Sequence, residues 1–113
     1  MSKCTNWLGT LNNPDVVPHE YLENIYTKMK AKYVCGQLEK GKEGTVHIQF
    51  FVNLPKPGQR ISALKKTCAK SHWEQVRINN GAHDYCMKED TRIEGPWEFG
   101  TKPVQRNNKD DWA

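Results

Sequence analysis

The chain has 113 residues, a length that suits one domain with a single modest core and is too short for two domains. Hydrophobic residues make up 36% of the sequence and aromatic residues 10%, a composition that excludes an intrinsically disordered chain. The formal net charge of +4 permits a polyanionic partner without requiring one.

The four cysteines are widely separated and form no C-x-x-C pair, which argues against a zinc site and against a disulfide framework. No segment has the apolar character of a signal peptide or the length of a membrane span. These features predict a soluble, intracellular protein with reduced thiols and no membrane partner.

The first third of the chain predicts a strand followed by an amphipathic helix. Residues 5–11 fit a short strand, which ends at the turn-forming sequence Asn-Asn-Pro of residues 12–14. A proline at position 18 suits the first turn of a helix. Beyond it, apolar residues recur at three- and four-residue spacing, so we expect a helix over residues 18–32.

Two further strands are expected over residues 33–38 and 46–54, and the glycine-containing linker between them suggests a hairpin. Residues 36–42 also match the start of a phosphate-binding loop, G-x-x-x-x-G-K. A glutamate follows in place of serine or threonine, and a strand is expected where a helix would receive the phosphate. ATP is therefore not an expected ligand of this domain.

The remaining elements are expected to be a helix over residues 61–68, a strand over 72–78, a short helix over 82–89 and a short strand over 97–99. This order predicts an α+β fold, a split β-α-β (RRM-like) arrangement. Its central sheet would be five-stranded and mostly antiparallel, with flanking helices. From residue 101 onward the sequence turns polar, which is typical of a linker.

Three side chains around the expected hairpin are candidate metal ligands. His47 and Gln49 are two residues apart on a strand, so their side chains project from the same face. Glu39, across the hairpin, would add a carboxylate. Imidazole nitrogen, amide oxygen and carboxylate oxygen together suit Mg²⁺ or Mn²⁺ and leave positions for water and phosphate. A solvated polar strand face would explain the same residues without a metal.

Tyr85 and Lys88 form a second candidate site. Residues three apart are neighbours on a helix surface, so this phenol and this ammonium can meet one phosphate. A phenolate that attacks phosphorus would form a phosphotyrosyl intermediate, and Lys88 would stabilise the negative charge. The alternative is that Tyr85 packs on its neighbours and Lys88 is a solvated charge.

Three motifs occur in order along the chain: TLNN at residues 10–13, HIQ at residues 47–49 and YCMK at residues 85–88. In this combination the chain resembles the HUH-type endonuclease domain of replication initiator (Rep) proteins from circular single-stranded DNA viruses. The resemblance is to the circovirus, nanovirus and alphasatellite type and spans roughly residues 7–100. The run at residues 85–100 is particularly similar to the nanovirus and alphasatellite versions.

The resemblance implies a role for each motif. It implies nucleic-acid-binding residues in the first motif: Thr10, Asn12 and Asn13. It implies ligands for a divalent metal, Mg²⁺ or Mn²⁺, on two neighbouring strands: Glu39, His47 and Gln49. It implies a catalytic pair in the last motif: Tyr85 as the nucleophile and Lys88 beside it. Many relatives carry a second histidine where this chain has Gln49.

Proteins of this family nick single-stranded DNA at a stem-loop origin, stay attached to the 5′ phosphate and later rejoin the ends, which starts rolling-circle replication. The resemblance thus implies a metal-dependent endonuclease and strand transferase that acts in the host nucleus. Residues 1–100 would form this domain, and residues 101–113 a polar linker toward an absent C-terminal helicase domain. An oligomer is expected only in a longer protein.

Two alternatives from other classes remain open. The same split β-α-β sheet serves non-catalytic single-stranded nucleic-acid-binding modules. A structural or partner-binding domain fits the composition but none of the motifs.

Overall fold

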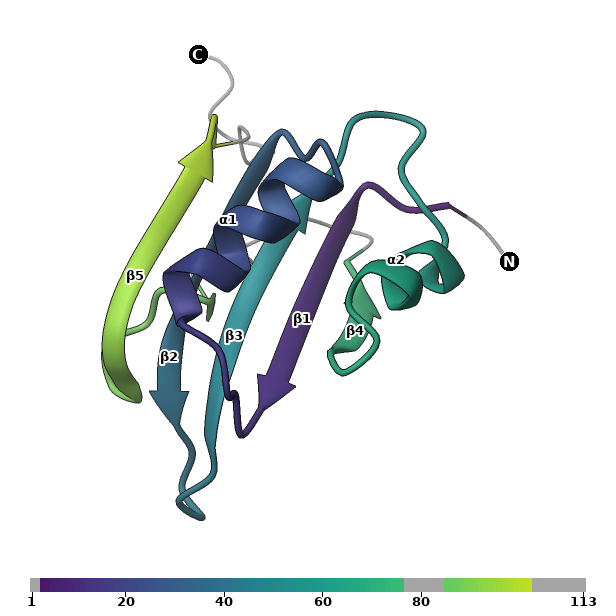
Figure 1. The fold of residues 1–113 in the computed structure, drawn as a ribbon. Coiled ribbons are helices and arrows are strands. Elements are labelled where there is room, and N and C mark those ends of the chain that lie inside the picture. Colours follow the sequence, from purple (N-terminus) through teal and green to yellow (C-terminus); the bar gives the residue numbers. More distant parts are fainter. Residues whose placement is uncertain (1–2, 77–84, 103–113) are drawn as a thin grey trace.

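The structure, a computed structural model, describes residues 3–76 and 85–102 (Figure 1). Its strands are β1 (Asn6–Asn12), β2 (Tyr33–Lys40), β3 (Val46–Asn53), β4 (His72–Gln75) and β5 (Arg92–Gly100). They form one antiparallel sheet in the order β4-β1-β3-β2-β5. Helices α1 (Pro18–Lys28) and α2 (Ile61–Thr67) both pack on one face of this sheet. The predicted α+β architecture with a five-stranded sheet is confirmed.

Helix α1 ends at Lys28, four residues before the expected end at Lys32. Lys30 adopts a left-handed backbone conformation with φ of 53°, which cannot continue the helix. The amide of Ala31 then donates back to the carbonyl oxygen of Tyr26 at 3.0 Å, so the chain reverses and enters β2. Periodicity extended the predicted helix because apolar residues continue past this reversal.

Strand β5 is much longer than the three residues expected from 97–99. Most of its residues are exposed, because it lies at the edge of the sheet and pairs only with β2 among the described strands. An edge strand is defined by backbone pairing and needs no alternation of apolar side chains. The sequence therefore carried no signal for its first half.

The expected helix over residues 82–89 is corrected at its C-terminal end. Tyr85 is helical, but Cys86 and Met87 form a turn, so the helix does not reach Glu89. Cys86 is fully buried on the sheet face opposite the two helices, and this contact draws the chain out of the helical path. Residues 77–84, which include the start of this expected helix and the end of the strand expected over 72–78, lie outside the described residues.

The two faces of the sheet bury different clusters. The larger apolar core lies between the sheet and the helices, with these buried residues among its members: Trp7, Leu22, Ile25, Val34, Ile48, Phe50, Val52, Leu64 and Trp73. The face opposite the helices, here called the open face, buries a smaller cluster: Tyr33, Cys35, Phe51 and Cys86. Alternation along the strands separates the two sets, because successive side chains point to opposite faces.

Phe50 packs between two glycines on the neighbouring strands. In the sheet register it pairs with Gly9 of β1 and with Gly36 of β2. A Cβ at Gly9 would lie 2.3 Å from a ring carbon of Phe50, and a Cβ at Gly36 would lie 2.7 Å from the Phe50 Cβ. This close approach requires glycine at both positions. Gly9, Phe50 and Gly36 thus form a row across three strands. The residues next to them in sequence have their side chains on the open face: Thr10, Gln37 and Gln49.

Candidate metal and nucleophile site

The pairing of three strands gathers the predicted site residues on the open face. Two rows of cross-strand partners run over β2, β3 and β1: Glu39, His47 and Asn12 in the first row, and Gln37, Gln49 and Thr10 in the second. Residues directly opposite each other on paired strands lie close enough to interact. Rows two residues apart face the same side of the sheet. The register therefore brings together residues from two of the three sequence motifs.

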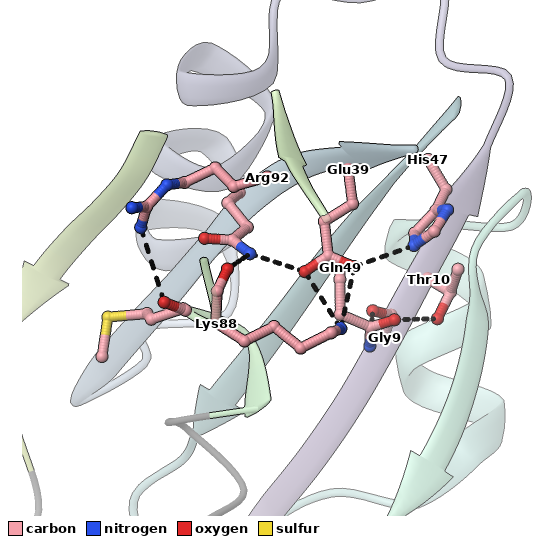
Figure 2. Close-up of polar contacts among 9 residues, drawn as sticks. Gly9, Thr10, Glu39, His47, Gln49, Lys88 and Arg92 are labelled. Carbon is pink, nitrogen blue, oxygen red and sulfur yellow. Dashed lines mark hydrogen bonds and ion pairs between the residues drawn. The ribbon is translucent and has the colours of Figure 1, made fainter. Parts of the chain in front are cut away.

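Glu39 is the centre of this site. Its side chain is 1% exposed, and a buried carboxylate is unfavourable unless it is paired. Its Oε1 lies 3.1 Å from His47 Nε2 and 3.2 Å from Lys88 Nζ. Its Oε2 accepts from Gln37 Nε2 at 2.6 Å and lies 3.4 Å from Lys88 Nζ. Figure 2 shows the carboxylate between the imidazole and the ammonium, so both oxygens have polar partners.

Gln49 is held by hydrogen bonds to β1. Its Nε2 donates to the carbonyl oxygen of Gly9 at 3.1 Å, and its Oε1 accepts from the Thr10 hydroxyl at 3.3 Å (Figure 2). Thr10, expected to contact DNA, thus contacts an expected metal ligand. If Gln49 Oε1 bound a metal, a metal–oxygen bond would replace the hydrogen bond that this oxygen accepts from Thr10.

The donor atoms of this site fit Mg²⁺ or Mn²⁺. The contacting atoms of Glu39 and His47 already converge, and carboxylate, imidazole and amide oxygen are suitable ligands for these ions. Among residues 3–76 and 85–102 there is no group of three or more His, Cys, Asp and Glu side chains that could hold a metal. A metal here would therefore depend on the Gln49 amide as the third ligand. Lys88 places a positive charge next to Glu39.

Lys88 also joins Tyr85 to the site. Its Nζ lies 4.2 Å from the centroid of the Tyr85 ring, within the range of a cation–π interaction. The Tyr85 side chain is 50% exposed. Tyr85 and Lys88 lie next to each other, as predicted. A turn brings them together, however, and not the helical spacing on which the prediction relied.

Cys86 anchors the segment that carries Tyr85. It packs against Tyr33, Cys35 and Phe51 on the open face. Burial raises the pKa of its thiol well above the ordinary value, so the thiol stays neutral at physiological pH. All four cysteines are free, as the sequence predicts. Tyr85 is thus held near the sheet by an apolar contact of its neighbour and by the ammonium of Lys88.

Asn12 and Asn13 lie beside this site. They line an open cavity of about 450 Å³ with residues of the β2–β3 hairpin: Gly41, Lys42, Glu43 and Thr45. His47 lines the same cavity and also contacts Glu39. The residues expected to bind DNA and the residues expected to bind metal are therefore contiguous.

Gln37 contacts the candidate site, although it lies outside the three sequence motifs. It is fully buried, and its Nε2 contacts both Glu39 Oε2 and the carbonyl oxygen of Lys88. One signal was available in the sequence, since residue 37 shares a strand face with Glu39 at two-residue spacing. Its second partner lies 51 residues away and could not be inferred.

Comparisons with known proteins show the family to which the chain is similar. Residues 4–89 match the model of the viral replication protein family, a range that includes every predicted site residue. The master replication protein of Banana bunchy top virus is 38% identical over 106 residues, which are 90% of this chain and 33% of that protein. The master replication protein of Subterranean clover stunt virus is 41% identical over 95 residues, 83% of this chain and 30% of that protein.

A further relative comes from another group of viruses. The replication-associated protein of Canary circovirus is 36% identical over 105 residues, which are 92% of this chain and 34% of that protein. The chain thus spans about a third of the length of these relatives. No helix in the described part of the chain is long and apolar enough to cross a membrane. From the family match and these identities we conclude that the chain belongs to the viral replication (Rep) protein family.

Proposed function

We propose that this domain nicks and rejoins single-stranded DNA at a viral stem-loop origin, with Tyr85 as the nucleophile. The observation that supports the proposal is the contact of two distant segments with Glu39. His47 and Lys88 both lie within 3.2 Å of its Oε1, and Lys88 Nζ lies 4.2 Å from the centroid of the Tyr85 ring. A phosphate near Tyr85 would therefore meet a cationic group and the candidate metal ligands together.

In the proposed reaction the Tyr85 oxygen attacks the scissile phosphorus and forms a new O–P bond. The bond between phosphorus and the 3′ oxygen breaks, the phenol proton passes to solvent, and the 3′ oxygen takes up a proton and leaves as a hydroxyl. The 5′ side of the nick stays attached to Tyr85 as a phosphotyrosine. Because the energy of the phosphodiester is kept in this link, the 3′ hydroxyl can reverse the reaction without ATP.

Glu39, His47 and Gln49 are the residues that would hold Mg²⁺ or Mn²⁺. When bound, a divalent cation supplies Lewis-acid stabilisation of charge on a phosphate oxygen. Lys88 stabilises the negative charge that develops on the phenol oxygen, because its ammonium lies against the Tyr85 ring. Half-exposure of Tyr85 keeps the nucleophile accessible to DNA.

The DNA on either side of the nick would extend over neighbouring residues. We assign origin recognition to Thr10, Asn12 and Asn13, since two of them line the cavity that His47 shares. The host nucleus as the place of action belongs to the same proposal. So does the division into an endonuclease domain over residues 1–100 and a linker over 101–113, of which residues 103–113 lie outside the described residues.

Cleavage of an origin-loop oligonucleotide tests this proposal. The protein is incubated with Mn²⁺ and a DNA strand labelled at its 3′ end, and the products are separated on a denaturing gel. We expect the labelled fragment to migrate with the protein, whereas a label at the 5′ end should appear on a shorter free strand. A strand that is bound in a native gel but intact in the denaturing gel would establish the non-catalytic binding module instead.

A further inference from the structure

Gln37 contacts both halves of the proposed site. It lies on β2, is fully buried, and faces the same side of the sheet as Glu39. Its Nε2 donates to Glu39 Oε2 at 2.6 Å and to the carbonyl oxygen of Lys88 at 2.6 Å. One amide nitrogen therefore links a candidate metal ligand to the segment that carries the nucleophile.

The two hydrogen bonds fix the orientation of the Gln37 amide. A primary amide nitrogen carries two N–H groups, and both of its partners here are acceptors. A flipped amide would place Gln37 Oε1 against two acceptor oxygens, one of Glu39 and one of Lys88. In the observed orientation Gln37 Oε1 is buried and has no hydrogen-bond partner among residues 3–76 and 85–102. A buried oxygen without a partner is unfavourable, so the two donations from Nε2 must compensate for it in this orientation.

The backbone around Gln37 is shaped to accommodate this side chain. The pairing of β2 with β5 shifts register between Gly36 and Leu38, directly across Gln37. Irregularities of this kind re-aim side chains and are common next to active sites. On β5, a Cβ at Gly95 would lie 3.3 Å from the Gln37 Cβ, and φ of 98° at this position favours glycine. Gly95 therefore leaves room for Gln37 beneath the edge strand.

We propose that Gln37 is a positioning residue that sets Glu39 for metal binding and Tyr85 for attack. This inference rests on the proposed function. By holding Oε2, Gln37 leaves Glu39 Oε1 to face His47. By holding the carbonyl of Lys88, it fixes the turn that follows Tyr85 and keeps the Lys88 ammonium within reach of the carboxylate. The same side chain thus couples the ligand geometry to the position of the nucleophile.

The variant Gln37→Met tests this role, because methionine has a similar length and cannot donate either hydrogen bond. We expect the Kd for Mn²⁺, measured by calorimetry without DNA, to rise about 10- to 100-fold, as for residues that orient metal ligands. The kcat for oligonucleotide cleavage should fall by about the same factor, while KM for the oligonucleotide changes less than about twofold. The matched control is Val34→Ala, a buried position of the same strand on the helix-covered face. It should lower the melting temperature and leave both Mn²⁺ affinity and kcat unchanged.

Two further measurements keep the inference falsifiable if Gln37→Met does not fold. Gln37→Asn retains an amide that is one methylene too short to reach both acceptors, and it should show the same losses. In the unmutated protein, the side-chain amide resonances of Gln37 should shift when Mg²⁺ is added, and their hydrogens should exchange slowly with solvent. Amide resonances that do not respond to Mg²⁺ would overturn the inference.

The outcomes separate this inference from the proposed function. If the unmutated protein cleaves DNA and a folded Gln37 variant keeps its Mn²⁺ affinity and kcat within twofold, the positioning role is wrong and the nuclease stands. If the unmutated protein forms no covalent product with DNA, the proposed function is wrong and this inference falls with it. A lower melting temperature alone, with unchanged Mn²⁺ affinity and kcat, would show a purely structural role and would also overturn it.

Discussion

The two faces of the central sheet differ in the side chains that they present. The helix-covered face is apolar, with Phe50 seated between Gly9 and Gly36. The open face carries a polar network around the buried carboxylate of Glu39, beside a small apolar cluster. Strand β3 contributes alternate residues to the two faces, so residues that are consecutive in sequence lie in different environments.

Unfavourable features collect on the open face. Glu39 is a charged group with 1% exposure, and Gln37 Oε1 is a buried oxygen with no hydrogen-bond partner in the part of the chain that the structure describes. Such features lower stability unless the surrounding structure compensates for them. The helix-covered face therefore supplies most of the apolar packing, whereas the open face carries the groups that the proposed reaction would use.

The largest effect should come from Tyr85→Phe. The change removes the proposed nucleophile, so we expect cleavage to fall by roughly 10³-fold or more on a denaturing gel. Tyr85 is 50% exposed, so the free energy of unfolding should change by less than about 0.5 kcal/mol. DNA binding should persist. Tyr26→Phe, a control on the helix-covered side, should cleave normally. Full cleavage by Tyr85→Phe would show that Tyr85 is not the nucleophile.

A core substitution tests whether the two faces are independent. Phe50→Ala should lower the free energy of unfolding by about 3–5 kcal/mol in urea denaturation, because it empties a packed site on the helix-covered face. The folded fraction should still bind Mn²⁺ with unchanged affinity. Phe51→Ala, at the next residue but on the open face, should reduce stability and also slow cleavage, since Phe51 packs against Cys86. A loss of Mn²⁺ affinity in the folded fraction of Phe50→Ala would contradict the separation of the faces.

A smaller effect is expected for His47→Ala. Loss of the imidazole should raise the Kd for Mn²⁺ by at least about tenfold, the loss typical of residues that support a metal site. Calorimetry measures the affinity, and the Mn²⁺ dependence of the cleavage rate gives a second readout. The control is His72→Ala, an exposed position on β4. An unchanged Mn²⁺ dependence would exclude His47 as a ligand.

The smallest effect is expected for Tyr33, which belongs to the buried cluster of the open face and donates a hydrogen bond to Glu98. Burial, and then the hydrogen bond to Glu98, raise the pKa of Tyr33 above its usual range. The stability that comes from this raised pKa is therefore complete below the unfolded pKa of about 10. It declines as the pH rises further, because above that pH Tyr33 ionises readily only in the unfolded chain. Tyr33→Phe should lower the free energy of unfolding by about 1 kcal/mol near pH 7.

The measurement for Tyr33 is urea denaturation between pH 7 and 11. The decline in stability above about pH 10 should be shallower in Tyr33→Phe than in the unmutated protein. Some decline should remain, because burial also raises the pKa of Tyr21. An identical decline in both proteins would show that Tyr33 does not contribute to it.

The sequence predicted those parts of the fold that have apolar periodicity. Alternation along residues 46–54 defined the central strand and its two faces, and with the hairpin it paired Glu39 with His47 correctly. The full extent of β5 could not be predicted, because backbone pairing alone defines this exposed edge strand. The early end of α1 depends on the left-handed backbone of Lys30, which residue types alone do not specify.

The sequence indicates which candidate residues share a face of the sheet but not which contacts they make. His47 and Gln49 share a face by strand geometry, as expected. The engagement of the Gln49 oxygen by Thr10 depends on the register of β1 with β3, which no local pattern reveals. The bond from Gln37 to the carbonyl of Lys88 depends on a turn of the chain that brings distant segments together.

The row of Gly9, Phe50 and Gly36 also limits how related chains can diverge in evolution. A larger residue at Gly9 would collide with the Phe50 ring, and a larger residue at Gly36 would collide with both Phe50 and the carbonyl oxygen of Gln49. A smaller residue at position 50 would therefore make room at Gly9 but not at Gly36. One residue inserted next to the row would turn the following side chains to the wrong face. Extra residues at the hairpin tips would leave this row intact, whereas an extra residue within β1, β2 or β3 would disturb it.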